Sequence, residues 1–250
     1  MQIQNREVDI STPTGTMRCY LYQPLATPAT AAKKVPAILL YSEIFQQTGP
    51  IRRSAQTLAG HGFIVLVPEV FHELNPIGTV LGYDDAGRDK GNADKVAKPL
   101  EAHDSDTQAM VDYLHGLDGC SGQIGAMGFC LGGGLAYRAA LHPAIAATSC
   151  FYATDIHSGL VPSQPGNDSL ARTGEIQGEL QMVWGKQDPH IPAEGRAVVY
   201  KKLSDTAVNF TWHEFNGVHA FMRDEGERYD AELQLLGYQM AIGMFRRVLY

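Results

Sequence analysis

The chain has 250 residues, of which 20 are basic and 27 acidic, so its formal net charge is −7. Hydrophobic residues make up 44% and charged residues 19%, which is typical of a folded globular protein rather than a disordered one. No cluster of lysine and arginine offers the basic face that binding duplex nucleic acid requires, so we expect no nucleic acid partner. The length suits one large domain, and we expect a single domain over residues 1–250.

The four cysteines are isolated from one another along the chain. Cys19, Cys120, Cys130 and Cys150 form no CxxC pair, so a zinc ribbon or a thioredoxin motif is absent. The first residues, MQIQNREVDISTPTG, lack the basic start and apolar core of a secretory signal, and the apolar runs are too short to cross a membrane. We therefore expect a cytoplasmic protein with no membrane partner, whose cysteines are free thiols.

The first part of the chain alternates strand-like and helix-like segments. Glu7–Ile10 and Met17–Tyr22, separated by turn-forming residues, predict an antiparallel hairpin at a sheet edge. Val35–Tyr41 and Phe63–Val67 are short, apolar and rich in β-formers, the pattern of strands buried on both faces of a parallel sheet. Between them, Ile51–Gly60 reads as a helix that ends at its glycine.

The same alternation continues to the end of the chain. The expected helices are Ser105–Leu117, Leu131–Leu141, Ala193–Leu203 and Tyr229–Val248, and the expected strands are Gln123–Met127, Ile145–Tyr152, Leu180–Trp184 and Val208–Glu214. Strands that alternate with helices over a whole chain predict an α/β fold with a mostly parallel central sheet and helices on both faces.

Two long segments are predicted to be irregular. Phe71–Pro99 is polar and heavily charged, and Asp155–Glu175 is rich in Gly, Pro and Ser. Loops of this length are often lids or binding loops, but a solvated insertion fits the composition equally well.

A glycine-rich segment carries the strongest chemical signal. Gly128-Phe129-Cys130-Leu131-Gly132 lies between a predicted strand and a predicted helix, which is the pattern of a nucleophile elbow with cysteine in place of serine. The nucleophile of an elbow occupies a strained turn, and glycines two positions away leave room for the adjoining backbone. The glycine spacing does not match a dinucleotide-binding or phosphate-binding loop. A buried cysteine in a glycine-rich turn is the alternative, and the five residues alone do not decide between the two.

Two later residues could complete a catalytic triad with Cys130. Asp188 follows the expected strand Leu180–Trp184, and His219 follows the expected strand Val208–Glu214. Taken singly, Asp188 fits a turn or helix cap and His219 fits a surface loop. Their order after the cysteine, with both at strand ends, is the nucleophile–acid–histidine order of the α/β-hydrolases. We therefore predict a Cys-Asp-His triad.

No metal site and no cofactor are expected. His72 and Glu73 begin like the HExxH zinc motif, but the second histidine is absent. The other histidines form no cluster with metal-ligand spacing.

Four short motifs, in order along the chain, resemble the dienelactone hydrolase family, a branch of the α/β-hydrolase fold. They are Glu43–Phe45, Gly128–Gly133, Gly185–Asp188 and His219–Arg223. The similarity extends from about Val35 to the C-terminal helix. It implies an α/β-hydrolase fold and a cysteine hydrolase that cleaves a small-molecule ester or lactone, with a substrate that can carry a carboxylate.

The resemblance also implies roles for individual residues. Cys130, Asp188 and His219 correspond to the family's triad, and Glu43 to a glutamate that can accept the thiol proton. The backbone N–H groups of Leu131 and Ile44 would form the oxyanion hole, and Arg223 would pair with a substrate carboxylate. Phe45, Tyr152 and His72 are further expected substrate-binding residues.

One position departs from the family pattern. Members that cleave dienelactone carry a second arginine in a Pro-Asp-Leu-Tyr-x-Arg stretch, but here Pro68-Glu-Val-Phe-His72-Glu73 places an acidic residue there. The two-arginine clamp is therefore at best half present, and the sequence does not establish dienelactone as the natural substrate. A thioesterase or small-ester carboxylesterase with the same triad is one alternative. A non-catalytic redox-sensing or binding protein with a reactive Cys130 thiol is another.

Overall fold

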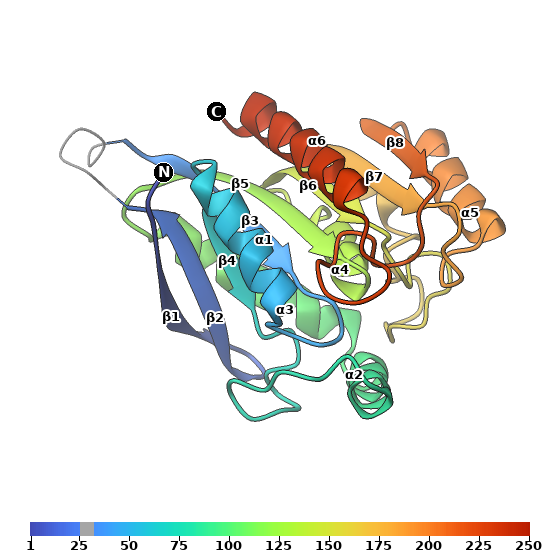
Figure 1. Cartoon of the computed structure of the whole chain (residues 1–250), viewed down its shortest axis with the longest axis horizontal. Coiled ribbons are helices and arrows are strands. Elements are labelled where there is room, and N and C mark those ends of the chain that lie inside the picture. Colours follow the sequence, from blue (N-terminus) through green and yellow to red (C-terminus); the bar gives the residue numbers. More distant parts are fainter. Residues whose placement is uncertain (26–32) are drawn as a thin grey trace.

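The computed structural model describes residues 1–25 and 33–250, which build an eight-stranded sheet (Figure 1). The strands are β1 (Ile3–Thr12), β2 (Gly15–Pro24), β3 (Val35–Tyr41), β4 (Ile64–Pro68), β5 (Cys120–Phe129), β6 (Ile145–Phe151), β7 (Glu179–Gly185) and β8 (Phe210–Phe215). Their spatial order is β1-β2-β4-β3-β5-β6-β7-β8. The strands from β3 to β8 run parallel, and β2 joins them antiparallel through β4.

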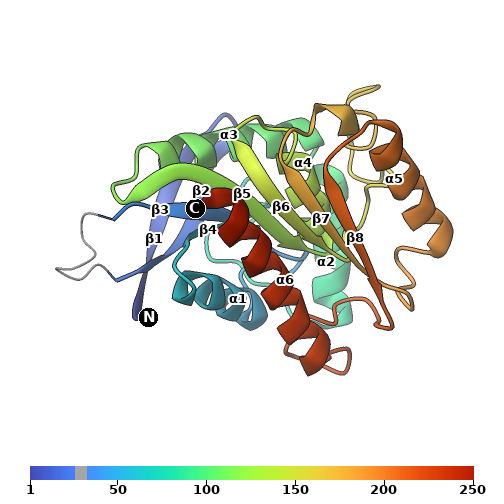
Figure 2. The same cartoon turned by 90° about the horizontal axis from the view of Figure 1, so that it is seen from above.

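Helices cover both faces of this sheet. They are α1 (Gly49–Gly60), α2 (Asp85–Ala97), α3 (Leu100–His115), α4 (Leu131–Ala139), α5 (Ala193–Asp205) and α6 (Ala231–Leu249), with a short 3₁₀ turn at Thr173–Glu175. Figure 2 shows α1 and α6 on one side of the sheet and α3 and α4 on the other. The predicted architecture is confirmed, including the N-terminal hairpin of β1 and β2.

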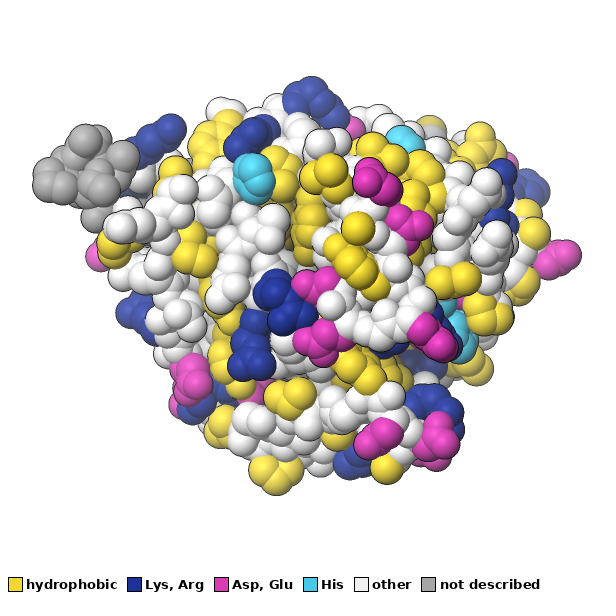
Figure 3. All heavy atoms as spheres, viewed as in Figure 1, with side chains coloured by type: hydrophobic (Ala, Val, Ile, Leu, Met, Phe, Trp, Pro, Cys, Tyr) yellow, Lys and Arg dark blue, Asp and Glu magenta, His cyan; other side chains and the backbone are white. Residues whose placement is uncertain are grey.

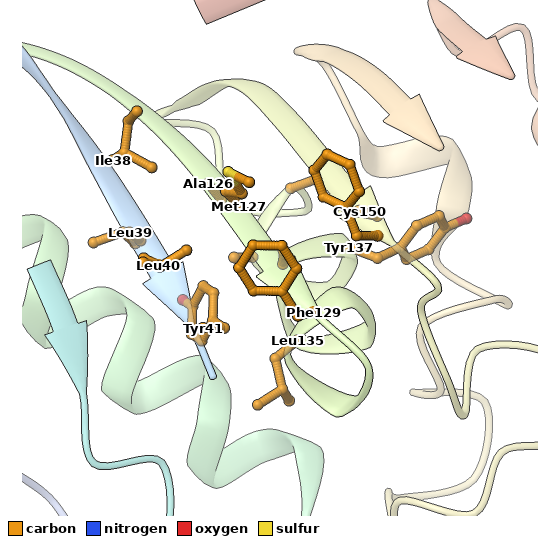
Figure 4. Packing of buried hydrophobic residues seen from close by; sticks show 14 of the residues in the cluster. Ile38, Leu39, Leu40, Tyr41, Ala126, Met127, Phe129, Leu135, Tyr137 and Cys150 are labelled. Carbon is orange, nitrogen blue, oxygen red and sulfur yellow. The ribbon is translucent and has the colours of Figure 1, made fainter. Parts of the chain in front are cut away.

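The central strands are apolar on both faces because both faces are covered. Figure 4 shows Ile38, Leu39 and Leu40 of β3 beside Ala126 and Met127 of β5, and all five are fully buried. Burial of such side chains contributes about 1.5–3 kcal/mol each for the larger ones. The core therefore holds the carboxyl ends of β3 and β5 side by side, and the loops that follow them meet at this edge.

The prediction for Phe71–Pro99 is wrong in part, because thirteen of its residues form helix α2. Asp84 caps the helix, with its side chain accepting a hydrogen bond from the N–H of Gly87 at 2.8 Å. Only Gly87, Gly91 and Asp94 of α2 are buried. The buried side of α2 thus has almost no apolar side chains, which is why a search for hydrophobic periodicity misses it. Asp155–Glu175 is irregular as predicted, apart from its 3₁₀ turn.

Charged side chains are dispersed on the face that Figure 3 displays, where acidic and basic groups lie next to one another. Several form exposed ion pairs, such as Arg53 with Asp224 at 2.6 Å. Among the helices of the described residues, none has both the length and the apolar character needed to span a bilayer.

Candidate active site

Cys130 occupies the sharp turn between β5 and α4. Its φ of +57° and ψ of −121° lie in a region that residues other than glycine rarely adopt. Two backbone hydrogen bonds hold this conformation: the Cys130 N–H donates to the carbonyl of Phe151 at 3.1 Å, and the Thr154 N–H donates to the Cys130 carbonyl at 3.0 Å. The turn exposes part of the cysteine side chain, whereas Cys19, Cys120 and Cys150 are buried.

The glycines around Cys130 allow a close backbone approach. A Cβ atom on Gly128 would overlap the carbonyl of Gly132, and one on Gly132 would overlap the end of β3 at Tyr41. A Cβ atom on Gly133 would lie 2.8 Å from the Cα atom of Ala153. Side chains at these positions would push α4 away from the sheet, so the elbow needs glycine for steric reasons.

His219 and Asp188 form a buried pair at the ends of their strands. The Nδ1 atom of His219 lies 2.6 Å from Oδ2 of Asp188, and Oδ1 of Asp188 accepts the N–H of His190 at 2.8 Å. Burial by itself lowers the pKa of His219, but the neighbouring Cys130 sulfur and the hydrogen bond to Asp188 outweigh it and raise this pKa to about 10. The raised pKa favours the protonated form of the His219 ring.

Cys130 and His219 line a cavity of about 680 Å³. Several predicted residues contribute to the same cavity, namely Glu43, Ile44, Phe45 and Arg223. Asp188 lies behind His219 and is almost completely buried. A cavity of this size accommodates a small organic molecule.

Glu43 and Arg223 form an ion pair on the cavity wall. The Oε2 atom of Glu43 lies 3.6 Å from Nη1 of Arg223, which is longer than a hydrogen bond. Burial raises the pKa of the Glu43 carboxyl, although Arg223 and His219 act in the opposite direction. The guanidinium of Arg223 stacks on the ring of Tyr83, 4.2 Å from its centroid. Among the described residues, neither Glu43 Oε2 nor Arg223 Nε has a hydrogen-bond partner.

The two expected oxyanion donors follow β3 and β5. Leu131 is the first residue of α4, so its N–H has no partner within the helix. Ile44 follows β3, and the contact of Gly132 with Tyr41 and Ser42 brings the start of α4 against this segment. The two N–H groups therefore come from segments that pack against each other.

Two predicted substrate-binding residues do not line the cavity. The ring of Tyr152 is buried and packs edge-on against the ring of His219, with centroids 5.1 Å apart. Tyr152 thus supports the histidine and does not contact the cavity.

His72 is the second predicted substrate-binding residue that does not line the cavity, because buried charged groups hold its side chain elsewhere. Its side chain is fully buried, and Nε2 lies 3.1 Å from Oδ1 of Asp106. Lys98, also fully buried, contacts Asp106 Oδ2 at 2.6 Å and Glu73 Oε2 at 2.8 Å. Glu73, at the position of the family's second arginine, likewise points to Lys98 and does not line the cavity.

We expect Lys98→Met to reduce the free energy of unfolding by about 3–5 kcal/mol, because it leaves the buried Asp106 without its cation. Urea unfolding of purified protein measures this loss. The control is Lys201→Met, which removes an exposed ion pair with Asp205 and should cost at most about 1 kcal/mol. Equal losses in the two variants would contradict a stabilising role of the buried cluster.

The sequence reasoning missed most of the polar residues of the cavity. They are Tyr83, Arg88, Asn92, Lys95, Thr154, His190, Glu225, Glu227 and Arg228. Asp84 and Asp85 also line the cavity. Positions 85, 88, 92 and 95 have the spacing of one helix face, and this signal could have revealed α2.

Comparison with known proteins identifies the family. The model of the dienelactone hydrolase family matches residues 21–249. A Saccharomyces cerevisiae protein assigned as a carboxymethylenebutenolidase is 40% identical over 87% of this chain and 81% of its own length. The carboxymethylenebutenolidase of Pseudomonas putida is 25% identical over 85% of each chain.

A solved structure supports the fold. A protein from Klebsiella pneumoniae, assigned as a dienelactone hydrolase, superposes with a TM-score of 0.85 over 99% of this chain and 100% of its own, at 20% identity. With the mostly parallel sheet and the covered faces, this agreement identifies the α/β-hydrolase fold. The chain belongs to the dienelactone hydrolase family and is a hydrolase.

Proposed function

We propose that the protein hydrolyses a carboxylic ester or lactone through a thioester on Cys130. The observation that carries this proposal is the shared cavity of Cys130 and His219, with the cysteine in a strained elbow and the histidine bonded to Asp188. The Cys130 sulfur attacks the carbonyl carbon, after Glu43 or His219 has taken its proton. The N–H groups of Leu131 and Ile44 then hold the oxyanion.

The second half of the reaction uses His219 as acid and base. A protonated His219, which has taken the thiol proton or, where Glu43 took it, carries its own because of its raised pKa, gives a proton to the leaving alkoxide, and the thioester on Cys130 forms. Water then loses a proton to His219 and attacks the thioester. The carboxylic acid leaves, and the sulfur takes a proton back from His219 or, where it took the thiol proton, from Glu43. Asp188 keeps the imidazole in the required orientation throughout. No metal or cofactor takes part in these steps.

Arg223 is proposed to bind a carboxylate of the substrate. It lines the cavity, its side chain is largely buried, and its Nε has no partner among the described residues. A guanidinium that lacks a full set of acceptors favours an anionic group of the ligand.

We expect Arg223→Lys and Arg223→Met to lower the preference for anionic esters. The substrates are 4-nitrophenyl hemisuccinate and the neutral 4-nitrophenyl valerate, compared through kcat/KM. A charge-assisted hydrogen bond contributes about 1.5–3 kcal/mol, so the ratio should fall by about tenfold or more in Arg223→Met. Arg223→Lys should lose less because it keeps the charge. An unchanged ratio in Arg223→Met would argue against carboxylate binding by this residue.

A panel of oxygen esters, thioesters and lactones tests the proposed function. The expected result is hydrolysis of at least one class by the wild type and none by Cys130→Ala. Faster turnover of thioesters than of oxygen esters would define the protein as a thioesterase. The proposal fails in favour of a thiol sensor if no class is hydrolysed and if Asp188→Ala and His219→Ala both keep the wild-type rate of Cys130 alkylation.

A further inference from the structure

Helix α2 forms one wall of the active-site cavity. Asp85, Arg88, Asn92 and Lys95, spaced three or four residues apart, all line it. In Figures 1 and 2 the helix lies beyond the carboxyl ends of the central strands, where the elbow also lies. An adjoining side of the helix, with Gly87, Gly91 and Asp94, is buried.

Helix α2 packs through Gly91 against Ile44, the proposed oxyanion donor. A Cβ atom on Gly91 would lie 2.7 Å from the carbonyl oxygen of Ile44 and 2.9 Å from its Cβ atom. Atoms that are not bonded do not approach this closely, so any side chain at position 91 must displace Ile44 or the helix. Ile44 is only 7% exposed and has little room to move.

The segment before α2 holds the same loop at other points. The Leu81 N–H donates to the Phe45 carbonyl at 3.1 Å, and the Tyr83 hydroxyl donates to Thr48 Oγ1 at 2.8 Å. The rings of Phe45 and Tyr83 also pack edge-on at 4.8 Å. Residues 81–83 thus make three contacts with the loop that follows β3, in addition to the close approach of Gly91 to Ile44.

The far end of α2 is fixed to the loop that follows β6. Lys95 Nζ lies 3.3 Å from Oδ1 of Asp155, and both side chains are largely buried. Thr154, the residue before Asp155, donates its N–H to the Cys130 carbonyl. Helix α2 therefore connects the Ile44 segment with a loop that contacts the nucleophile.

We infer that Gly91 is a positioning residue for the oxyanion hole. The absence of a side chain at position 91 sets how closely α2 packs on Ile44, and this distance sets where the Ile44 N–H points. The inference rests on the proposed function, since it needs Ile44 as an oxyanion donor. A displaced donor weakens stabilisation of the transition state more than binding of the ester.

The test is Gly91→Ala, assayed with an ester that the wild type hydrolyses. We expect kcat to fall by about 10- to 100-fold, since misplacing a catalytic group by an ångström can cost about 100-fold. KM should change by less than about threefold, as expected when an interaction made only in the transition state is lost. Alkylation of Cys130 by iodoacetamide, which forms no oxyanion, should keep its wild-type rate.

The control is Gly243→Ala in helix α6, where an added Cβ atom would meet nothing within 4 Å and the residue is exposed. We expect this variant to fold like the wild type, with kcat changed by less than about threefold. If Gly91→Ala does not fold, Tyr83→Phe, which removes only the bond to Thr48, should show a smaller kcat loss with unchanged alkylation.

Three results would overturn the inference. They are wild-type kcat in folded Gly91→Ala, equal kcat losses in the two glycine variants, and slower alkylation in parallel with slower hydrolysis. If instead Cys130→Ala retains wild-type hydrolysis, the proposed function fails, and this outcome is distinguishable because it does not involve position 91.

Discussion

Replacing Cys130 with alanine is expected to reduce ester hydrolysis by about 10⁴-fold or more, because removal of a nucleophile leaves only binding and oxyanion stabilisation. The strained backbone at Cys130, with φ of +57°, presents the sulfur to the cavity that His219 also lines. A serine hydroxyl is a weaker nucleophile than a thiol and gives up its proton less readily to His219. Cys130→Ser should therefore also lose most of its activity. Initial rates at saturating substrate measure both losses.

Cys120→Ala is the matched control for the nucleophile. Cys120 is the first residue of β5 and Cys130 directly follows the last, so the two cysteines lie at opposite ends of one strand. The Cys120 side chain is buried away from the cavity. This variant should keep wild-type kcat. Wild-type turnover by Cys130→Ala would refute the cysteine mechanism.

Asp188→Asn is expected to lower kcat by about 10⁴-fold, as the corresponding change does in a serine protease triad. In this protein Oδ2 of Asp188 accepts from Nδ1 of His219 at 2.6 Å, whereas an asparagine amide can turn its NH₂ toward that atom. The imidazole would then carry its proton on the nitrogen that faces Cys130 and could not act as a base. Single-turnover kinetics measure the loss in acylation and deacylation separately.

The same variant has a predictable effect on stability. The Cys130 sulfur and Asp188 together raise the pKa of His219 from 6.5 to about 10, so the share that comes from Asp188 stabilises the folded state below pH 6.5 and is lost as the pH rises through 10. The difference in Tm between wild type and Asp188→Asn should therefore be largest at pH 6 and narrow toward pH 10. Asp205→Asn, which alters an exposed ion pair with Lys201, serves as the control and should keep wild-type kcat. A constant Tm difference, or wild-type kcat in Asp188→Asn, would contradict this role of Asp188.

The sheet could be predicted because its strands are buried on both faces. The segment Val35–Tyr41 was predicted as a strand and forms β3 with the same bounds. The predicted strand Gln123–Met127 is extended at both ends to Cys120–Phe129. The added residues include Cys120, Ser121 and Gly122, which form no continuous apolar run, so periodicity cannot reveal them.

Helix α2 could not be predicted from hydrophobic periodicity because glycines make its closest contacts. Gly87 and Gly91 permit backbone approach to Gly82 and Ile44, and this information lies in the tertiary structure rather than in local propensity. Glycine also disfavours a helix by about 1 kcal/mol per residue, so propensity points to a loop. Tertiary contacts decide the structure of this segment.

The candidate triad was predictable because chain order and strand ends are visible in the sequence. The surroundings of His72 were not. His72 was expected to bind substrate, but Lys98 and Asp106, both more than twenty residues later, hold His72 and Glu73 in a buried cluster. Long-range ion pairs of this kind leave no local pattern. The same holds for Tyr83 and Arg228, which reach the cavity from separate loops.

Mass spectrometry of the acylated protein tests the central claim most directly. A 4-nitrophenyl ester is mixed with the enzyme, the reaction is stopped with acid after a few milliseconds to seconds, and the digested peptides are sequenced. The account predicts one acyl group on Cys130, with greater accumulation in Asp188→Asn if deacylation becomes the slower step. An acyl group on another residue, or rapid hydrolysis with no adduct at any time, would contradict it.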